Sequence, residues 1–259
     1  MILLSFDTEE FDVPREHGVD FSLERGMDVS VAGTNRILDC LAMNRVRATF
    51  FCTGNFAERA PEVMRRIMAE GHEVACHGVD HWRPQATDVE RSKQIVERVT
   101  GRTVSGYRQP RMFPVSDGEI ERMGYRYNSS LNPAFIPGRY MHLSAPRTWF
   151  MRGSVMQIPA SVTPWVRFPL FWLALHNLPE GLYHALVRRV LRHDGYFDPW
   201  EFYELREHPE FRMPFIIRNN SGAAMVARLD RLIKMLKDRG HHFITFNEFV
   251  DIKLSETQQ

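Results

Sequence analysis

The sequence predicts an α/β protein built on a parallel sheet, and two observations support this fold class. Short apolar segments typical of strands alternate with amphipathic helical segments through the first half of the chain. The 259 residues also fall in the range of one α/β domain, since such barrels commonly use about 200 to 250 residues. Repeated strand–helix units favour either a barrel or a doubly wound sheet.

The first half of the chain is expected to hold four strand–helix units. Strands are predicted at residues 2–6, 48–52, 72–76 and 103–107, with further extended chain at 125–130. Helices are predicted at 34–43, 61–70, 87–99 and 116–123. Pro61 is typical of a helix start, and Gly71 and Gly101 of helix ends; Thr87 and Glu90 have the spacing of a capping box.

The second half of the chain is less regular. Residues 140–170 are interpreted as short strands and proline-rich loops, followed by a helix at 180–193 and a strand at 195–198. A helix at 222–239, a strand at 242–246 and a C-terminal helix complete the prediction. Because no internal repeat or linker is evident, residues 1–259 are interpreted as a single domain.

Composition argues against several classes of protein. Lys and Arg total 33 against 32 for Asp and Glu, so the overall charge gives no support for nucleic-acid binding. Cys40, Cys52 and Cys76 lie inside apolar runs, which is typical of buried free thiols in a reducing compartment. The N-terminal segment also lacks the features of a signal peptide, so we expect a cytoplasmic protein.

The longest apolar stretch, residues 164–178, does not predict a membrane span. Arg167, Pro169 and His176 interrupt it, and it is shorter than the roughly 20 residues that cross a bilayer. Its aromatic residues and the following Arg188, Arg189 and Arg192 are compatible with peripheral contact at a membrane surface. Packing in the protein core is the preferred interpretation of this stretch.

Polar side chains follow several predicted strands at the point where each strand ends. Asp7 and Glu9 follow the first strand, His77 and His81 the third, Arg108 the fourth, and Asp198 the strand at 195–198. Active sites of parallel α/β proteins assemble at this edge of the sheet. We therefore expect these side chains to converge.

The residue types at these strand ends are suited to metal-dependent hydrolysis. His77 and His81 are spaced so that both imidazoles can reach one ion, although such a spacing can also arise by chance. Asp7 and Glu9 point to the same side if the backbone stays extended, so one could bind metal and the other accept a proton. Glu10 and Asp12 are interpreted as an acidic loop that caps the following turn.

Two further strand ends add candidates. Arg108 could pair with Asp7 and fix its orientation and charge state, or form an ordinary structural ion pair. Pro110 and Trp200 are candidates for substrate contact, although an aromatic side chain such as Trp200 more often packs in the core or at its rim.

These motifs together resemble the polysaccharide deacetylase family, the NodB-type carbohydrate esterases. SFDTEE is similar to the family's first motif, the segment around His77 and His81 to its second, and GYRQP to its third. The segments GYRYNSSLNP, QIPASVTPWVRFPL and FITFNEFV resemble those of sugar deacetylases of surface-polysaccharide or O-antigen synthesis. The resemblance implies a distorted, incomplete (β/α) barrel of about seven strands with helices outside it.

The resemblance also implies a role for each motif residue. Asp7 matches the catalytic base, Glu9, His77 and His81 the metal ligands, and Arg108 the arginine that tunes the base. The family's usual Asp-Asp pair is here Asp7-Thr8-Glu9, so the metal ligand is assigned to Glu9. In FDPWEF, Asp198 stands where the family has a histidine that acts as general acid.

The function implied is metal-dependent removal of an N-acyl group, most simply acetyl, from a sugar in a polysaccharide or its lipid-linked precursor. Zn²⁺ is the metal that this ligand set favours, although two histidines and a carboxylate also suit Fe, Co, Ni or Mn. A deformylase or cyclic-amide hydrolase on the same fold is one alternative. A non-catalytic glycan-binding or scaffold protein is another, because the expected histidine is replaced by Asp198.

Overall fold

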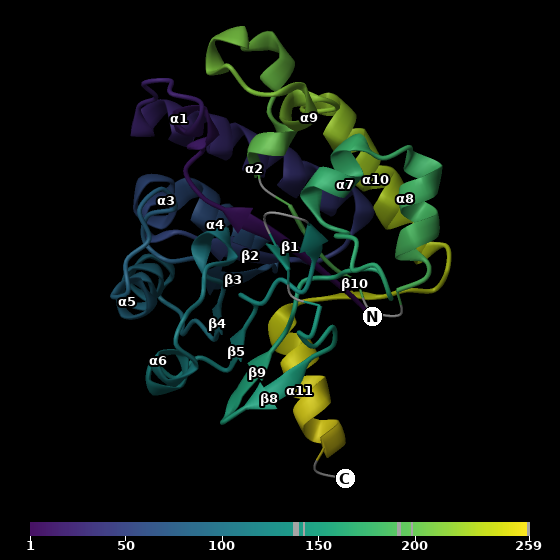
Figure 1. Cartoon of the computed structure of the whole chain (residues 1–259). Helices are drawn as coiled ribbons and strands as arrows, with labels where there is room; N and C mark the ends of the chain where they lie inside the picture. The colour runs from purple at the N-terminus through teal and green to yellow at the C-terminus, as the bar shows by residue number, and fades with distance from the viewer. Residues whose placement is uncertain (137–139, 142, 191–192, 198, 258–259) are drawn as a thin grey trace.

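The structure, a computed structural model, describes residues 1–136, 140–141, 143–190, 193–197 and 199–257. Its main sheet has the strand order β10-β1-β2-β3-β4-β5-β9-β8, with β11 pairing beside β1 (Figure 1). Neighbouring strands from β10 to β9 are parallel, and only the terminal pair β8–β9 is antiparallel. This curled, open sheet confirms the expected incomplete barrel, and its parallel part has seven strands in order.

The strands are short. Their bounds are β1 Ile2–Thr8, β2 Thr49–Cys52, β3 Glu73–Cys76, β4 Gly106–Tyr107, β5 Tyr127–Asn128, β6 Phe135–Ile136, β7 Tyr140–Met141, β8 Phe150–Arg152, β9 Val155–Gln157, β10 His193–Phe197 and β11 Phe243–Ile244. Strands β6 and β7 form a separate antiparallel pair.

Helices surround the sheet (Figure 1). They are α1 Val13–Glu16, α2 Leu23–Asn44, α3 Gly54–Arg59, α4 Pro61–Ala69, α5 Asp88–Thr100, α6 Asp117–Arg122, α7 Trp172–Asn177, α8 Glu180–Val187, α9 Phe215–Arg218, α10 Ala223–Lys237 and α11 Phe246–Thr257, with 3₁₀ turns η1 Pro110–Met112, η2 Pro199–Phe202, η3 Leu205–Glu207 and η4 Pro209–Phe211.

Alternation along the strands divides the core between the two faces of the sheet. In β1, Leu4 and Phe6 pack with the outer helices in the larger cluster. Leu3 points the other way, toward Phe51 and the apolar side of α11. Ser5 and Asp7, two and four residues after Leu3, point to the same inner face of the sheet. This alternation directs polar groups into the mouth of the barrel.

Several predicted boundaries were wrong. The helix predicted at 34–43 is α2, which begins at Leu23 after an N-cap by Ser22. The first half of α2 was missed because glycines interrupt its apolar pattern where the helix contacts other backbone. A Cβ on Gly26 would lie 2.5 Å from the carbonyl oxygen of Phe11, and a Cβ on Gly33 would lie 1.8 Å from the carbonyl oxygen of Pro199. The short helices α1 and α3 were also missed, because a single turn leaves too little periodicity.

Other differences concern the ends of elements. The predicted strand at 103–107 is reduced to the two residues of β4, and the strand at 242–246 ends early because α11 begins at Phe246. The helix predicted at 180–193 ends at Val187. Thr87 is the N-cap of α5, but its side chain makes no capping hydrogen bond, so the predicted capping box is not formed. Gly71 and Gly101 have left-handed backbone at helix ends, as predicted.

Candidate active site

Strand β1 delivers two carboxylates to the C-terminal edge of the sheet. Asp7 lies within the strand and Glu9 directly after it, and both side chains are buried. Loops after β3 and β4 bring His77, His81 and Arg108 to the same place, because His77 directly follows β3 and Arg108 directly follows β4. The convergence of strand ends is therefore the origin of the site.

Glu9, His77 and His81 form a cluster that could hold a metal ion. One ligand atom from each lies within 4.8 Å of the others. Oε2 of Glu9 is 3.2 Å from Nε2 of His77 and 3.2 Å from Nε2 of His81. Two imidazole nitrogens and one carboxylate oxygen around a common point are the donor set of catalytic divalent-metal sites that keep an open position.

The second ring nitrogen of each histidine is held by another group, and this supports the metal interpretation. Nδ1 of His77 lies 2.9 Å from the carbonyl oxygen of Arg108, to which it can only donate. Nδ1 of His81 lies 2.7 Å from a carboxylate oxygen of Asp12. Both contacts place the proton on Nδ1 and direct the Nε2 lone pair toward Glu9, as metal-binding histidines require. Burial lowers the pKa of His77 to about 4, which favours the neutral imidazole.

The interpretation of Glu10 and Asp12 as a capping loop was wrong. Asp12 precedes α1, yet its side chain makes no capping bond and instead contacts His81 and Arg111. Glu10 accepts hydrogen bonds from the His81 amide and from the side chains of Thr53 and Asn55. A sequence signal did exist, because a histidine ligand needs an acceptor for its second nitrogen and carboxylates often provide it.

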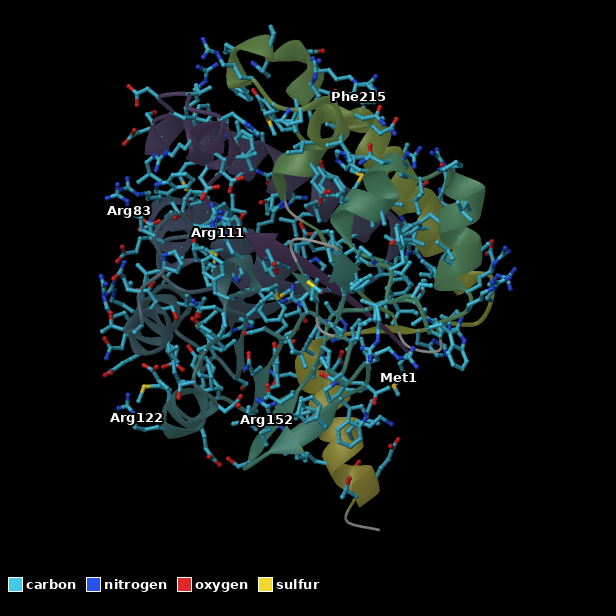
Figure 2. All side chains as sticks on the ribbon, viewed as in Figure 1. Met1, Arg83, Arg111, Arg122, Arg152 and Phe215 are labelled. Atoms are coloured by element: carbon cyan, nitrogen blue, oxygen red, sulfur yellow. The ribbon has the colours of Figure 1, made fainter. Side chains whose placement is uncertain are left out.

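Arg111 completes this outer layer. Its guanidinium lies 3.4 Å from Asp12 and also pairs with Glu16 at the end of α1. In Figure 2 it lies inside the outline of the molecule, whereas Arg83 and Arg122 lie at the edge. Burial would raise the pKa of Asp12, but its hydrogen bonds to His81 and Arg111 and the nearby charge of Arg111 lower it overall. Asp12 is therefore held as an anion behind the histidine.

Arg108 holds Asp7 beside the cluster. Nη1 of this fully buried arginine lies 2.5 Å from Oδ1 of Asp7 and 3.0 Å from the hydroxyl of Ser5. Its Nη2 donates to the hydroxyl of Ser129 at 2.9 Å, and its guanidinium lies 3.9 Å from the ring centre of Phe51. Oδ2 of Asp7 is 3.9 Å from Nε2 of His77, so this oxygen faces the cluster.

The remaining predicted residues lie in two places. Pro110 is buried in η1 and packs against the loop after His77, where a Cβ on Gly78 would lie 2.9 Å from its ring. Gly78 has a φ of +67°, so the loop needs glycine for both backbone conformation and space. Trp200 belongs to η2. Asp198 lies outside the described residues.

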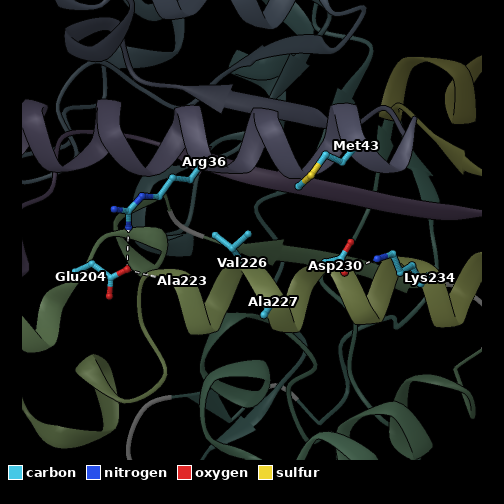
Figure 3. A pocket seen from close by; sticks show the side chains of 8 residues that line it. All are labelled: Arg36, Met43, Glu204, Ala223, Val226, Ala227, Asp230 and Lys234. Atoms are coloured by element: carbon cyan, nitrogen blue, oxygen red, sulfur yellow. Dashed lines mark hydrogen bonds and ion pairs between the residues drawn. The ribbon is translucent and has the colours of Figure 1, made fainter.

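A surface pocket of about 460 Å³ lies elsewhere, between α2 and α10 (Figure 3). Arg36 pairs with Glu204 at one end of it, and Lys234 pairs with Asp230 at the other. None of the candidate site residues lines this pocket. Its lining residues are Arg36, Met43, Glu204, Ala223, Val226, Ala227, Asp230 and Lys234.

Sequence comparisons agree with the motifs. Residues 21–127 match the family model described as polysaccharide deacetylase. A chitooligosaccharide deacetylase of Rhizobium leguminosarum bv. trifolii is 35% identical over 122 residues, which cover 46% of this chain and 54% of that enzyme. A peptidoglycan deacetylase of Helicobacter pylori is 21% identical over 259 residues, covering 88% of this chain and 86% of that enzyme. The first of these alignments thus spans about half of its relative's length.

Solved structures share the fold. A Mycobacterium smegmatis protein assigned as a polysaccharide deacetylase aligns with a TM-score of 0.68 at 18% identity, covering 99% of this chain and 90% of that one. A family pseudoenzyme from Bacillus anthracis aligns with a TM-score of 0.54 at 14% identity, covering 96% and 65%. The chain is thus similar to polysaccharide deacetylases over residues 21–127, and it shares its fold with these solved structures.

Proposed function

We propose that the protein is a metal-dependent hydrolase that removes an N-acyl group, most simply acetyl, from a sugar in a polysaccharide or its lipid-linked precursor. The observation that carries this proposal is the placement of Asp7 beside the Glu9–His77–His81 cluster. One oxygen of Asp7 is held by Arg108, and the other faces the cluster at 3.9 Å from Nε2 of His77. A ligand set and a positioned carboxylate thus lie together at the sheet edge, as hydrolysis of an amide requires.

Each residue has a defined task in this proposal. Glu9, His77 and His81 would hold a divalent ion, and their ligand types favour Zn²⁺. The ion would supply the Lewis acidity that activates water and polarises the acyl carbonyl. Oδ2 of Asp7 accepts the proton of the attacking water, while Arg108 holds Oδ1 and fixes the direction of the carboxylate. Asp198 is proposed as the acid that protonates the leaving amine, with Trp200 and Pro110 near the sugar.

The test separates acid–base chemistry from metal binding. Asp7→Asn should keep the metal but lower the rate of acetate release from N-acetylglucosamine oligomers by about 10²- to 10⁴-fold, the usual worth of a positioned base. Asp20→Asn is the matched control, because Asp20 is exposed, and its rate should equal that of the wild type. Full activity of Asp7→Asn would remove Asp7 from the mechanism.

Product analysis distinguishes the two hydrolytic alternatives. Formate in place of acetate would identify a deformylase, and ring opening without release of an acid would identify a cyclic-amide hydrolase. The same barrel and ligands can support all three reactions, so the product decides between them.

The non-catalytic alternative rests on Asp198 at the position of the expected histidine. If Asp198 is the working acid, the change Asp198→His should lower the rate of hydrolysis. If the protein is a glycan-binding member that has lost its acid, the same change should create or raise hydrolysis. The wild type would then bind sugar oligomers without releasing acetate.

We also propose a cytoplasmic site of action. Cys40, Cys52 and Cys76 are all buried and free. Burial raises the pKa of Cys40 and Cys76 to about 12, which keeps both thiols protonated and unreactive. Within the described residues, no helix is both long and apolar enough to cross a bilayer. Thiol labelling of the unfolded protein purified from its native cells should find three free cysteines.

A further inference from the structure

Several exposed apolar side chains lie in loops at the same edge of the sheet as the candidate active site. We define the apolar ridge as Met141, Leu143, Trp165, Val166 and Phe168. Trp165 is 94% exposed, Met141 69%, Val166 67% and Leu143 53%. Core packing was the preferred interpretation of the stretch from Trp165 onward, and it holds for Leu170, Phe171, Ala174 and Leu175, which are buried. It was wrong for the first residues, which project into solvent.

Hydrogen bonds join the two loops that carry the apolar ridge. The guanidinium of Arg167 donates to the carbonyl oxygens of Leu143 and Ala145, at 2.6 and 2.8 Å. The Phe168 amide donates to the Thr163 hydroxyl, which closes the loop that presents Trp165. Within that loop Trp165 and Arg167 have positive φ angles of 65° and 53°. Bulky residues rarely adopt this conformation, so the tryptophan is held outward at a cost in backbone strain.

The apolar ridge lies at the same edge of the sheet as the candidate active site. Its loops follow the C-terminal ends of β5 and β9, just as the site residues follow β1, β3 and β4. Val162 pairs with Pro169 at the base of the loop that presents Trp165. Val162 also belongs to a small buried cluster with Ala134, Ala160 and Phe171, against which Met112 of η1 packs. Because η1 begins at Pro110, two residues after Arg108, this cluster reaches from the base of the Trp165 loop to the segment that follows Arg108.

The segment of the sequence that carries the apolar ridge is basic. Residues 122–179 contain six arginines and no Asp or Glu, although the whole chain has 33 basic and 32 acidic residues. Arg126 and Arg152 pair with acids from other segments. In the described part of the chain, no carboxylate lies within ion-pair distance of Arg147 or Arg167, the two arginines of the ridge loops. Burial and the charge of Arg147 together lower the pKa of Arg167.

We infer that the apolar ridge is a docking surface for the headgroup region of an anionic lipid bilayer. An exposed tryptophan with aliphatic neighbours is suited to the interface between headgroups and acyl chains. Arginines without a carboxylate partner beside it are attracted to anionic lipid headgroups. A soluble anionic glycan would account for the arginines and could stack on Trp165, but it would not account for the exposed aliphatic side chains of Val166, Met141 and Leu143. Docking would turn the mouth of the site toward the membrane, where a lipid-linked sugar resides; only this last consequence rests on the proposed function.

The test is flotation of the full-length protein with vesicles of phosphatidylcholine, with and without phosphatidylglycerol. The wild type should float with the anionic vesicles and release from them at high salt. Arg147→Gln should weaken binding about fivefold, since one arginine near such a surface contributes about that factor. Trp165→Gln should weaken it at least as much. Phe215→Gln is the matched control, because Phe215 is 66% exposed but lies in α9, outside the ridge, and it should bind as the wild type does.

Two results would overturn this inference. One is failure of the folded wild type, checked by circular dichroism, to float with anionic vesicles. The other is equal flotation of wild type and Trp165→Gln together with displacement of both by soluble polygalacturonate, which would identify a glycan surface. The proposed function and the membrane inference can fail independently of each other. The variant His81→Ala should lose hydrolytic activity and still float with anionic vesicles.

Discussion

At the scale of single residues, the candidate site consists of five converging side chains and of the groups that hold them in place. Asp7, Glu9, His77, His81 and Arg108 were predictable because parallel strand ends meet at one edge, and the structure brings all five together. Their assigned roles stay predictions. Asp12 was misassigned because its proximity to His81 depends on how two loops fold toward each other over 69 positions of sequence separation, which periodicity does not encode.

Asp12→Asn is expected to weaken metal binding about 10- to 100-fold, because the orienting carboxylate behind His81 is lost. Competition with a chromophoric Zn²⁺ chelator measures the dissociation constant. Glu16→Gln is the matched control, since Glu16 contacts Arg111 but not the histidine. Equal affinities of wild type and Asp12→Asn would show that the contact is only structural.

At the scale of elements, strongly periodic helices and apolar strands were predictable, and elements defined by close backbone contact were not. The four segments at 2–6, 48–52, 72–76 and 61–70 closely match β1, β2, β3 and α4. The first half of α2 was missed because its glycines mark contact with other segments rather than a break in the helix. The ends of β4 and β11 depend on where neighbouring strands provide hydrogen-bond partners, which only the assembled sheet defines.

Gly33→Ala should lower the free energy of unfolding by about 1–3 kcal/mol or more, because the new methyl group would lie 1.8 Å from the Pro199 carbonyl oxygen and push α2 from η2. Gly181→Ala, in α8, is the control: nothing lies within 4 Å of the new Cβ, so it should raise stability by about 0.5–1 kcal/mol. Urea unfolding measures both. A neutral Gly33→Ala would contradict the close packing of α2 on η2.

At the scale of the whole molecule, the alternation of elements predicted a barrel or a doubly wound sheet, and the family resemblance implied an incomplete barrel, which the structure confirms. The single-domain organisation stays a prediction. The irregular second half forms the separate β6–β7 pair and the loops of the apolar ridge. Periodicity could not place these segments, because their positions depend on hydrogen bonds between distant loops such as those of Arg167.

Acid should destabilise the fold through histidines that are buried as neutral rings away from the site. Burial lowers the pKa of His72 and His176 to about 4 from a usual 6.5. Between these values the unfolded chain binds more protons, so the free energy of unfolding is highest above pH 6.5 and falls as the pH drops toward 4. The loss is on the order of 1–3 kcal/mol per histidine.

Urea unfolding at a series of pH values tests this dependence. His72→Gln should flatten the profile between pH 4 and 6.5, because one titrating group is removed. His242→Gln, at an exposed position, should leave the slope unchanged. A wild-type profile that is flat over this range would show that neither ring is buried as a neutral group.

The most direct test of the central claim is metal content by elemental analysis. Wild type, Glu9→Ala and His81→Ala should be purified and loaded with Zn²⁺ identically, with folding checked by circular dichroism. We predict about one equivalent of metal in the wild type and its loss in both variants, because each removes one of three converging ligands. A folded, loaded wild type without metal, or variants that retain a full equivalent, would contradict the assignment of this site.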